Sequence, residues 1–129
     1  MLEGGCHCGR VRYRASGRAY NRSICHCSIC RRTTGAPMVA WFSVAKADFV
    51  LVRGTLTSYQ SSAIGRRGFC PICGTQVTFQ DDRLAGEIDV TTASLDDPEA
   101  VPPEYHIFTS TKLDCVKLSD GLPLYEEQR

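Results

Sequence analysis

The chain has 129 residues, of which 43% are hydrophobic and 22% are charged, and its formal net charge is +1 at pH 7. These values fit a single domain over residues 1–129 with a core of its own, and the small net charge makes a nucleic-acid-binding polycation an unlikely class. No apolar stretch is long enough to span a bilayer, and Cys6 already belongs to a cysteine motif where a signal peptide would lie, so we expect a cytoplasmic protein without membrane contact.

Charge is unevenly distributed along the chain. Residues 1–35 carry seven arginines against one acid, Glu3, which gives this part a net charge of +6 and leaves −5 for the rest. The arginines are Arg10, Arg12, Arg14, Arg18, Arg22, Arg31 and Arg32. This basic third is therefore the part of the chain that would contact a nucleic acid or an acidic protein, if any part does.

Alternation of side chains predicts the first strand. Val11, Tyr13 and Ala15 alternate with arginines over residues 10–15, which is the period of a strand with one solvent-exposed face. Gly17 ends this pattern. For the three arginines between the apolar residues, a solvated strand face is the simplest interpretation.

The middle of the chain predicts a loop and three strands. Residues 33–37, Thr-Thr-Gly-Ala-Pro, have the composition of a loop. Residues 38–44 are apolar and predict a buried strand, and residues 49–52 and 56–60 predict a hairpin around Gly54, because both segments are rich in β-branched or aromatic residues.

The later segments are also short. Residues 65–68 predict a turn or bulge, and residues 69–74, Phe-Cys-Pro-Ile-Cys-Gly, predict a metal-binding knuckle, since proline fixes one dihedral angle and glycine accepts a left-handed one. Short alternating segments occupy 76–79, 87–91 and 105–110, and residues 96–99 could start a single helical turn. No window shows a helical period over three turns, so we expect an all-β domain of short strands.

Seven of the eight cysteines fall into three closely spaced groups. The groups are Cys6 and Cys8, then Cys25, Cys27 and Cys30, then Cys70 and Cys73. In a reducing compartment such spacing favours metal ligands over disulfides. Short spacings also let thiolates converge on one ion at little cost in loop entropy.

The number of cysteines indicates two zinc sites of different kinds. A structural zinc takes four protein ligands, whereas a catalytic zinc takes three and leaves one position to water or substrate. Cys6, Cys8, Cys70 and Cys73 would form a closed set of four, which leaves Cys25, Cys27 and Cys30 as an open set of three. Spacing alone leaves other divisions possible.

Six short segments, spread in order over nearly the whole chain, form a specific pattern. They are Gly-Gly-Cys-His-Cys-Gly at 4–9, Cys-His-Cys-Ser-Ile-Cys-Arg-Arg at 25–32, Gly-Ala-Pro at 35–37, Ser-Ser at 61–62, Arg-Gly-Phe-Cys-Pro-Ile-Cys-Gly-Thr at 67–75 and Asp-Gly-Leu-Pro at 120–123. Together they resemble the glutathione-dependent formaldehyde-activating enzyme family. One difference is Cys115, in a segment where members of that family commonly carry tryptophan.

The resemblance implies a fold, a cofactor and a reaction. The fold would be two small antiparallel sheets of the β-tent, zinc-ribbon-like type, pinned by zinc. The resemblance also implies two zinc ions per chain, a structural one at the closed set of four cysteines and a catalytic-type one at the open set of three. The activity would be that of an S-(hydroxymethyl)glutathione synthase, a carbon–sulfur lyase type, with glutathione or another small thiol and formaldehyde as partners.

The open set admits a second interpretation, in which a protein side chain supplies a fourth ligand. His26, His106 and Cys115 are the candidates. His7 and His26 each lie between two cysteines, and strand alternation would turn both away from a metal that their neighbours face. His106 is more simply a satisfied histidine, and Cys115 a buried free thiol that packs as a small apolar residue.

Two arginines follow the open set directly. Because guanidinium binds carboxylate through two parallel hydrogen bonds and glutathione has two carboxylates, Arg31 and Arg32 are the candidate carboxylate contacts, with Arg66 or Arg67 as further members. Ser61 and Ser62 suit a turn and a pocket wall equally well. Two other classes of protein remain alternatives: a non-catalytic zinc-binding module that contacts a protein or nucleic acid, and a thiol-regulated metal sensor or store.

Overall fold

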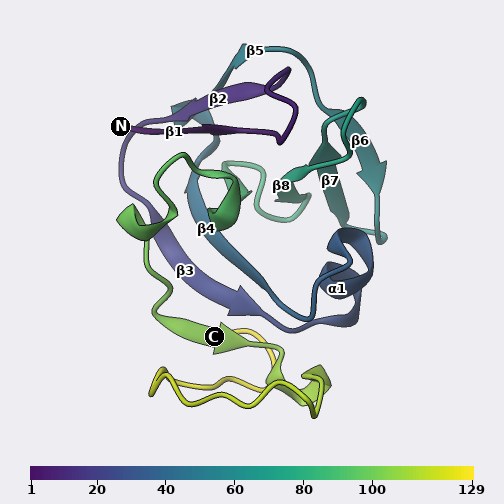
Figure 1. Cartoon of the computed structure of the whole chain (residues 1–129), viewed down its shortest axis with the longest axis vertical. Helices are drawn as coiled ribbons and strands as arrows, with labels where there is room; N and C mark the ends of the chain where they lie inside the picture. The colour runs from purple at the N-terminus through teal and green to yellow at the C-terminus, as the bar shows by residue number, and fades with distance from the viewer.

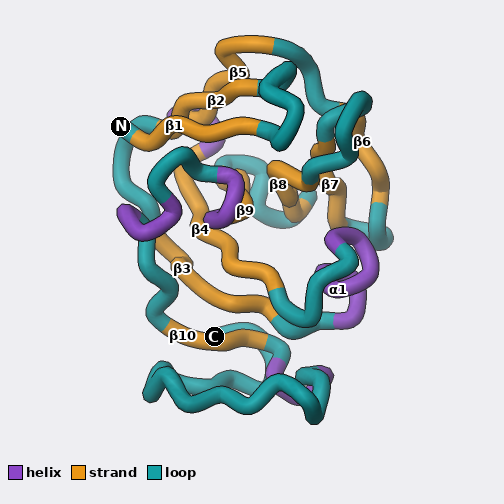
Figure 2. The backbone as a smooth tube through the Cα atoms, viewed as in Figure 1, coloured by secondary structure: helices purple, strands orange, loops and turns teal.

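The computed structural model describes all 129 residues and contains two β-sheets (Figure 1, Figure 2). The smaller sheet has the strand order β1-β2-β5 and consists of β1 (Leu2–Gly5), β2 (Arg12–Ala15) and β5 (Phe49–Arg53). The larger sheet has the order β10-β3-β4-β9-β8-β7-β6. Its strands are β3 (Tyr20–Cys25), β4 (Val39–Ala45), β6 (Thr57–Gln60), β7 (Gly65–Phe69), β8 (Gln76–Asp81), β9 (Glu87–Thr91) and β10 (Tyr105–Ile107).

The predicted all-β class with two sheets is confirmed, with one difference in strand direction. All neighbouring strands run antiparallel except β10, which pairs parallel with β3. The C-terminal residues continue alongside β10, where the amide of His106 donates to the carbonyl of Pro123 and the amide of Tyr125 donates to the carbonyl of His106 (Figure 1). The larger sheet is therefore mixed.

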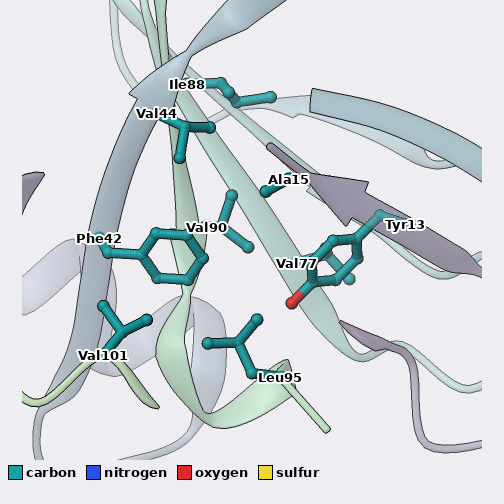
Figure 3. Close-up of a cluster of buried hydrophobic side chains, with 9 residues drawn as sticks. All are labelled: Tyr13, Ala15, Phe42, Val44, Val77, Ile88, Val90, Leu95 and Val101. Atoms are coloured by element: carbon teal, nitrogen blue, oxygen red, sulfur yellow. The ribbon is translucent and has the colours of Figure 1, made fainter. Parts of the chain in front are cut away.

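A core of nine buried residues joins the two sheets (Figure 3). They are Tyr13, Ala15, Phe42, Val44, Val77, Ile88, Val90, Leu95 and Val101. Tyr13 and Ala15 come from β2 and have almost no exposed area, whereas Arg14 between them is exposed, as the predicted alternation requires. Burial of this apolar surface is the main force that holds one sheet on the other.

The predicted hairpin around Gly54 is wrong, although both of its strands exist. β5 pairs with β2 in the smaller sheet, and β6 pairs with β7 in the larger one. Gly54 has a φ of +73°, and a Cβ there would collide with the carbonyl oxygen of Arg10. The glycine therefore lets the chain pass close to its own N-terminal segment as it crosses between sheets.

Residues 65–68 form most of β7 and are not a turn. The register against β8 shifts between Gly68 and Phe69, so the predicted bulge is present at the end of the strand. A Cβ at Gly68 would collide with Thr78 Oγ1, which explains why a glycine occupies the interior of a paired strand.

One short helix, α1 (Ser28–Thr34), has no counterpart in the prediction. It includes Thr33 and Thr34, so the predicted loop is correct only from Gly35 onward. Cys27 is the N-cap, with its sulfur accepting from the amide of Cys30, and Gly35 ends the helix with a φ of +68°. Seven residues make two turns, too few for a periodic signal in the sequence.

The other helical segments are single 3₁₀ turns. They are Lys46–Asp48, Thr92–Ser94, Pro98–Ala100 and Thr109–Thr111. The turn at Pro98–Ala100 confirms the helical turn expected near residues 96–99. No helix of this chain combines the length and the apolar character that crossing a membrane requires.

Candidate metal centre

Four cysteine sulfurs from distant parts of the chain meet beside the smaller sheet. Cys6 and Cys8 lie in the loop between β1 and β2, and Cys70 and Cys73 follow β7; their Sγ atoms all lie within 4.8 Å of one another. The Cys6–Cys8 and Cys8–Cys70 sulfur distances are 3.5 and 3.8 Å. Four sulfurs placed about 2.3 Å from a tetrahedral zinc would be about 3.8 Å apart, so this set fits a closed zinc site.

Backbone amides around the four-sulfur set donate to the sulfurs, as the knuckle prediction requires. The amide of Val11 is 3.2 Å from Cys6 Sγ, and the amides of Ile72 and Cys73 are 3.4 and 3.5 Å from Cys70 Sγ. Gly74 has a φ of +79° and donates its amide to the carbonyl of Cys70. These amides point their positive ends at the two sulfurs, and the hydrogen bond from Val11 is among the causes that lower the pKa of Cys6.

The second set, Cys25, Cys27 and Cys30, is built from the end of β3 and the start of α1. Their sulfurs also lie within 4.8 Å of one another, and Cys25 and Cys30 are buried. The amide of Cys27 lies 3.5 Å from Cys25 Sγ, and the amide of Cys30 lies 3.3 Å from Cys27 Sγ. These two hydrogen bonds thus fix the sulfurs of Cys25 and Cys27 relative to the start of the helix.

Electrostatics within the three-sulfur set favour a bound cation. Hydrogen bonds from Cys25 and Cys30 lower the pKa of Cys27, whereas the hydrogen bond to Cys27 raises the pKa of Cys25. Cys27 is therefore the sulfur of this set that most readily becomes a thiolate. Three thiolates this close together need a divalent ion between them, and a soft one such as Zn²⁺ suits sulfur ligands.

None of the three candidate fourth ligands joins this set. The rings of His26 and His106 are fully buried and hydrogen-bonded to each other, with 2.8 Å between His26 Nε2 and His106 Nδ1. Cys115 is exposed, so the expectation that it is a buried apolar thiol is wrong. His7 is exposed as well, and only its backbone amide makes a contact, to Thr75 Oγ1. The set therefore offers three cysteine sulfurs and no fourth side chain that could bind a metal beside them.

All three cysteines of this set line a cavity of about 660 Å³. The wall next to the sulfurs is largely apolar, with Trp41, Phe79, Ile107 and Phe108. A second cavity, of about 690 Å³, touches Cys6 and Cys73 of the four-sulfur set. Because four sulfurs saturate a tetrahedral zinc, only the three-sulfur set could present an open position to a ligand in its cavity.

Arg67 is a cavity residue whose side chain reaches the three-sulfur set. Its side chain is buried, and Nη1 and Nη2 are each 3.6 Å from Cys30 Sγ, while Nε donates to Ser61 Oγ at 2.9 Å. Ser61 and Ser62 both line the same cavity. From the sequence we expected Arg67 only as a further contact for a substrate carboxylate. Its contact with Cys30 was not predictable from spacing, because the two residues are 37 positions apart.

The arginines predicted as carboxylate contacts lie elsewhere. Arg31 and Arg32 are on α1 and are not among the residues that line the three-sulfur cavity, whereas Arg67, Arg83 and Arg129 are. Arg31 Nε is buried and has no hydrogen-bond partner. Arg66 is paired with Asp82, with 2.7 Å between Nη2 and Oδ1.

Three polar residues, Asn21, Ser43 and Asp89, also line the cavity and were not predicted. Ser43 Oγ donates to Asp89 Oδ1 at 2.5 Å, and Asn21 Nδ2 donates to Ser43 Oγ at 3.3 Å. Burial raises the pKa of Asp89 to about 6, and the hydrogen bond from Ser43 opposes this only in part. The sequence contains a signal that could have indicated Asp89. It is an acidic residue between Ile88 and Val90, two apolar residues of the same strand that are buried.

Two arginines of the basic N-terminal third are paired with acids from later in the chain, Arg12 with Asp96 and Arg22 with Glu104. Arg14 is paired with Glu3, the one acid of the same part of the chain. The two pairs with later acids each cancel one of the six net positive charges that a nucleic-acid contact would use. This weakens the electrostatic basis of the alternative in which the chain is a nucleic-acid-binding module.

Comparisons with known proteins found a family model, a relative and a solved structure that each match most of this chain. The family model described as glutathione-dependent formaldehyde-activating enzyme matches residues 1–111. A Halomonas elongata protein, named as a candidate glutathione-dependent formaldehyde-activating enzyme, is 33% identical over 127 residues, which cover 92% of this chain and 81% of that protein. The crystal structure of a Rhodobacter sphaeroides protein superimposes with a TM-score of 0.59 at 27% identity, over 95% of this chain and 98% of that one.

Proposed function

The chain belongs to the glutathione-dependent formaldehyde-activating enzyme family, and on that premise we propose that it catalyses the addition of glutathione or a similar small thiol to formaldehyde. In this reaction a carbon–sulfur bond forms between the thiol sulfur and the carbonyl carbon, and the thiol proton ends on the carbonyl oxygen. The product is an S-hydroxymethyl thiol. The reverse reaction breaks the same bond, which makes the enzyme a carbon–sulfur lyase type.

The proposed cofactor is zinc, two ions per chain. The closed set of Cys6, Cys8, Cys70 and Cys73 would hold a structural ion, and Cys25, Cys27 and Cys30 would hold the other. At the three-sulfur set, zinc would supply a Lewis acid and a binding position that suits a fourth sulfur. The structural ion would join the N-terminal loop to the segment after β7 and so pin the smaller sheet to the larger one.

The single observation that carries this proposal is that three sulfurs without a fourth protein ligand open onto a cavity. A volume of about 660 Å³ lies within the range of small-ligand sites. Apart from Arg67, the cavity residues that pack against the sulfurs are apolar, which would limit the access of water to the reacting atoms. The other parts of the cavity are charged, which would orient a polar thiol.

Cavity arginines are the proposed contacts for the carboxylates of the thiol. Arg83 and Arg129 line the cavity, and Arg83 is held by Asp81, with 2.7 Å between Nη2 and Oδ2. Arg31 and Arg32 remain the sequence-based candidates for the same role. Arginine suits it in either place because its planar group binds carboxylate through two hydrogen bonds.

We place this activity in the cytoplasm, where thiols stay reduced. All eight cysteines are free, so neither sulfur set is consumed by disulfides. A substrate thiol and the cysteine ligands would both need this reduced state.

The experiment that tests the proposal measures exchange, because thiols also add to formaldehyde without a catalyst. Zinc-loaded protein is mixed with glutathione and ¹³C-formaldehyde. The rate at which the ¹³C label exchanges between free formaldehyde and the S-hydroxymethyl product is measured by NMR. We expect the protein to raise this rate and Cys27→Ser to abolish the increase while the four-sulfur set keeps its zinc. An exchange rate equal to that of the uncatalysed mixture would refute the proposed function.

A further inference from the structure

Arg67 is a buried cation without a carboxylate partner. Its side chain is 5% exposed, and no aspartate or glutamate forms an ion pair with it. Its neutral contacts are Ser61 Oγ, at 2.9 Å from Nε, and Thr33 Oγ1, at 3.4 Å from Nη1. Buried charges in proteins are normally paired, so an anion is expected near the guanidinium.

The sulfur of Cys30 is the atom that the guanidinium contacts and that can supply this anion, since Asp89 in the same cavity forms no ion pair with Arg67. Both terminal nitrogens of Arg67 face it at 3.6 Å. A neutral thiol would leave the cation uncompensated, whereas a thiolate that binds a metal carries the charge that the guanidinium needs. The position of Arg67 therefore suits the thiolate form of the three-sulfur set, which is the form that binds a metal.

Two aromatic rings hold the guanidinium in this position. Its central carbon lies 4.8 Å from the centre of the Phe79 ring and 6.0 Å from that of Trp41. Both rings line the cavity and shield the cation from water, which strengthens its interaction with the sulfur. Lysine at this position would keep the positive charge. It would lose the pair of nitrogens that faces Cys30 Sγ and most of the contact with the two rings.

Charge counting gives this contact a role in ligand selection. A divalent ion on three thiolates carries a net charge of −1, and a further thiolate would raise this to −2 in a partly buried place. The positive charge of Arg67 brings these totals to 0 and −1. We propose that Arg67 is a positioning residue whose charge, acting through Cys30, lets the three-sulfur set take in an anionic thiol.

This proposal rests on the proposed function, since it takes a zinc at the three cysteines and a thiol substrate as given. The first measurement therefore needs no substrate. Cobalt(II) is exchanged into the three-sulfur set while the four-sulfur set keeps zinc, and the energy of the sulfur-to-cobalt charge-transfer band is recorded. A cation near a coordinating sulfur stabilises its electrons, so removing that cation moves the band to lower energy.

The variant Arg67→Gln removes the charge at similar length, and Arg67→Lys keeps it. Arg66→Gln is the matched control, because Arg66 is on the same strand but is exposed and paired with Asp82. We expect the band to move to lower energy in Arg67→Gln, to move less in Arg67→Lys and to stay unchanged in Arg66→Gln. If Arg67→Gln does not fold, Ser61→Ala loosens the guanidinium and should give a smaller shift in the same direction.

The second measurement is glutathione binding to the zinc-loaded proteins by calorimetry. We expect Arg67→Gln to weaken it by about tenfold or more and Arg67→Lys to recover part of the loss. An unchanged band in Arg67→Gln, or equal losses of affinity in the Gln and Lys variants, would overturn the proposal and leave Arg67 a packing residue. If wild-type protein does not bind glutathione, the proposed function fails, and the charge-transfer band still decides the contact with Cys30.

Discussion

His26 lies between two predicted zinc ligands in the sequence, yet its ring Nε2 is hydrogen-bonded at 2.8 Å to Nδ1 of His106. His106 Nε2 is in turn 2.8 Å from Asp120 Oδ2. Both rings are fully buried. The three side chains therefore tie the loop that carries Cys25 and Cys27 to β10 and to the C-terminal segment.

Replacing His106 by leucine should destabilise the fold. His106→Leu removes both hydrogen bonds, and His26 would then be buried with neither ring nitrogen paired, because its Nδ1 already has no partner. We expect the free energy of unfolding of the zinc-loaded protein, from urea denaturation, to fall by about 2–4 kcal/mol. His7→Leu, on the exposed surface, should change it by less than about 0.5 kcal/mol. Equal effects of the two substitutions would contradict a structural role for this chain of histidines.

A strand was predictable where its own pattern of apolar and polar residues shows which side chains are buried. Tyr13 and Ala15 alternate with arginines, and residues 38–44 are apolar apart from Ser43, so β2 and β4 were expected within two residues of their bounds. Strand pairing was not predictable in the same way, because partners are chosen by the whole core. β5 and β6 are neighbours in sequence, but burial of Tyr13 against Phe49, 5.3 Å apart between ring centres, takes β5 into the other sheet.

The division of cysteines into four and three was predictable because short spacings restrict which sulfurs can meet. The residues around the three-sulfur set were not. Arg31 and Arg32 follow the set in sequence, but α1 carries them away from the cavity, while β7 brings in Arg67 from 37 positions beyond Cys30. Proximity in sequence therefore indicated which sulfurs lie together, but it was a poor guide to the cavity wall.

The two sulfur sets should differ in their effect on folding. Cys70 is fully buried and its set joins segments about 60 positions apart, as the 62-residue separation of Cys8 and Cys70 illustrates. Cys70→Ser should therefore lower the unfolding free energy by more than about 3 kcal/mol, because metal binding at a closed site contributes to folding. Cys27→Ser should cost less, since serine is also a strong N-cap for α1.

Metal analysis accompanies this comparison. We expect wild-type protein to contain about two zinc ions per chain and Cys27→Ser to contain about one. Mass spectrometry under native conditions gives the stoichiometry, and thermal denaturation gives the stability of the same samples. Equal damage from Cys70→Ser and Cys27→Ser would contradict the division into a structural and an open site.

Two arginine substitutions test whether Arg83 or Arg31 binds the carboxylates of glutathione. Arg83 lines the cavity and Arg31 does not. We expect Arg83→Ala to weaken glutathione binding by about three- to tenfold, as for a partly exposed charge pair, and Arg31→Ala to weaken it less. Zinc content should stay unchanged in both variants. A loss in Arg31→Ala that matches or exceeds that in Arg83→Ala, measured by calorimetry, would favour the assignment made from sequence.

Asp89 should make stability fall as the pH rises. Burial raises the pKa of this carboxyl from its ordinary value of 3.8 to about 6, so between these values the folded chain binds more protons than the unfolded chain. Stability is then highest below the lower value and is lost as the pH passes through the higher one. Replacing Asp89 by asparagine removes this dependence while it keeps a polar group beside Ser43.

The advantage of Asp89→Asn over wild type should therefore grow with pH. We expect the difference in unfolding free energy to increase by about 1 kcal/mol between pH 5 and pH 7.5. Urea denaturation of both proteins at each pH measures it, and Asp114→Asn, at an exposed position, is the control. Comparing variants cancels the pH dependence of zinc binding, which they share. A difference that stays constant over this range would mean that Asp89 is ionised in the fold at pH 5, and therefore that its cavity is more hydrated than its burial indicates.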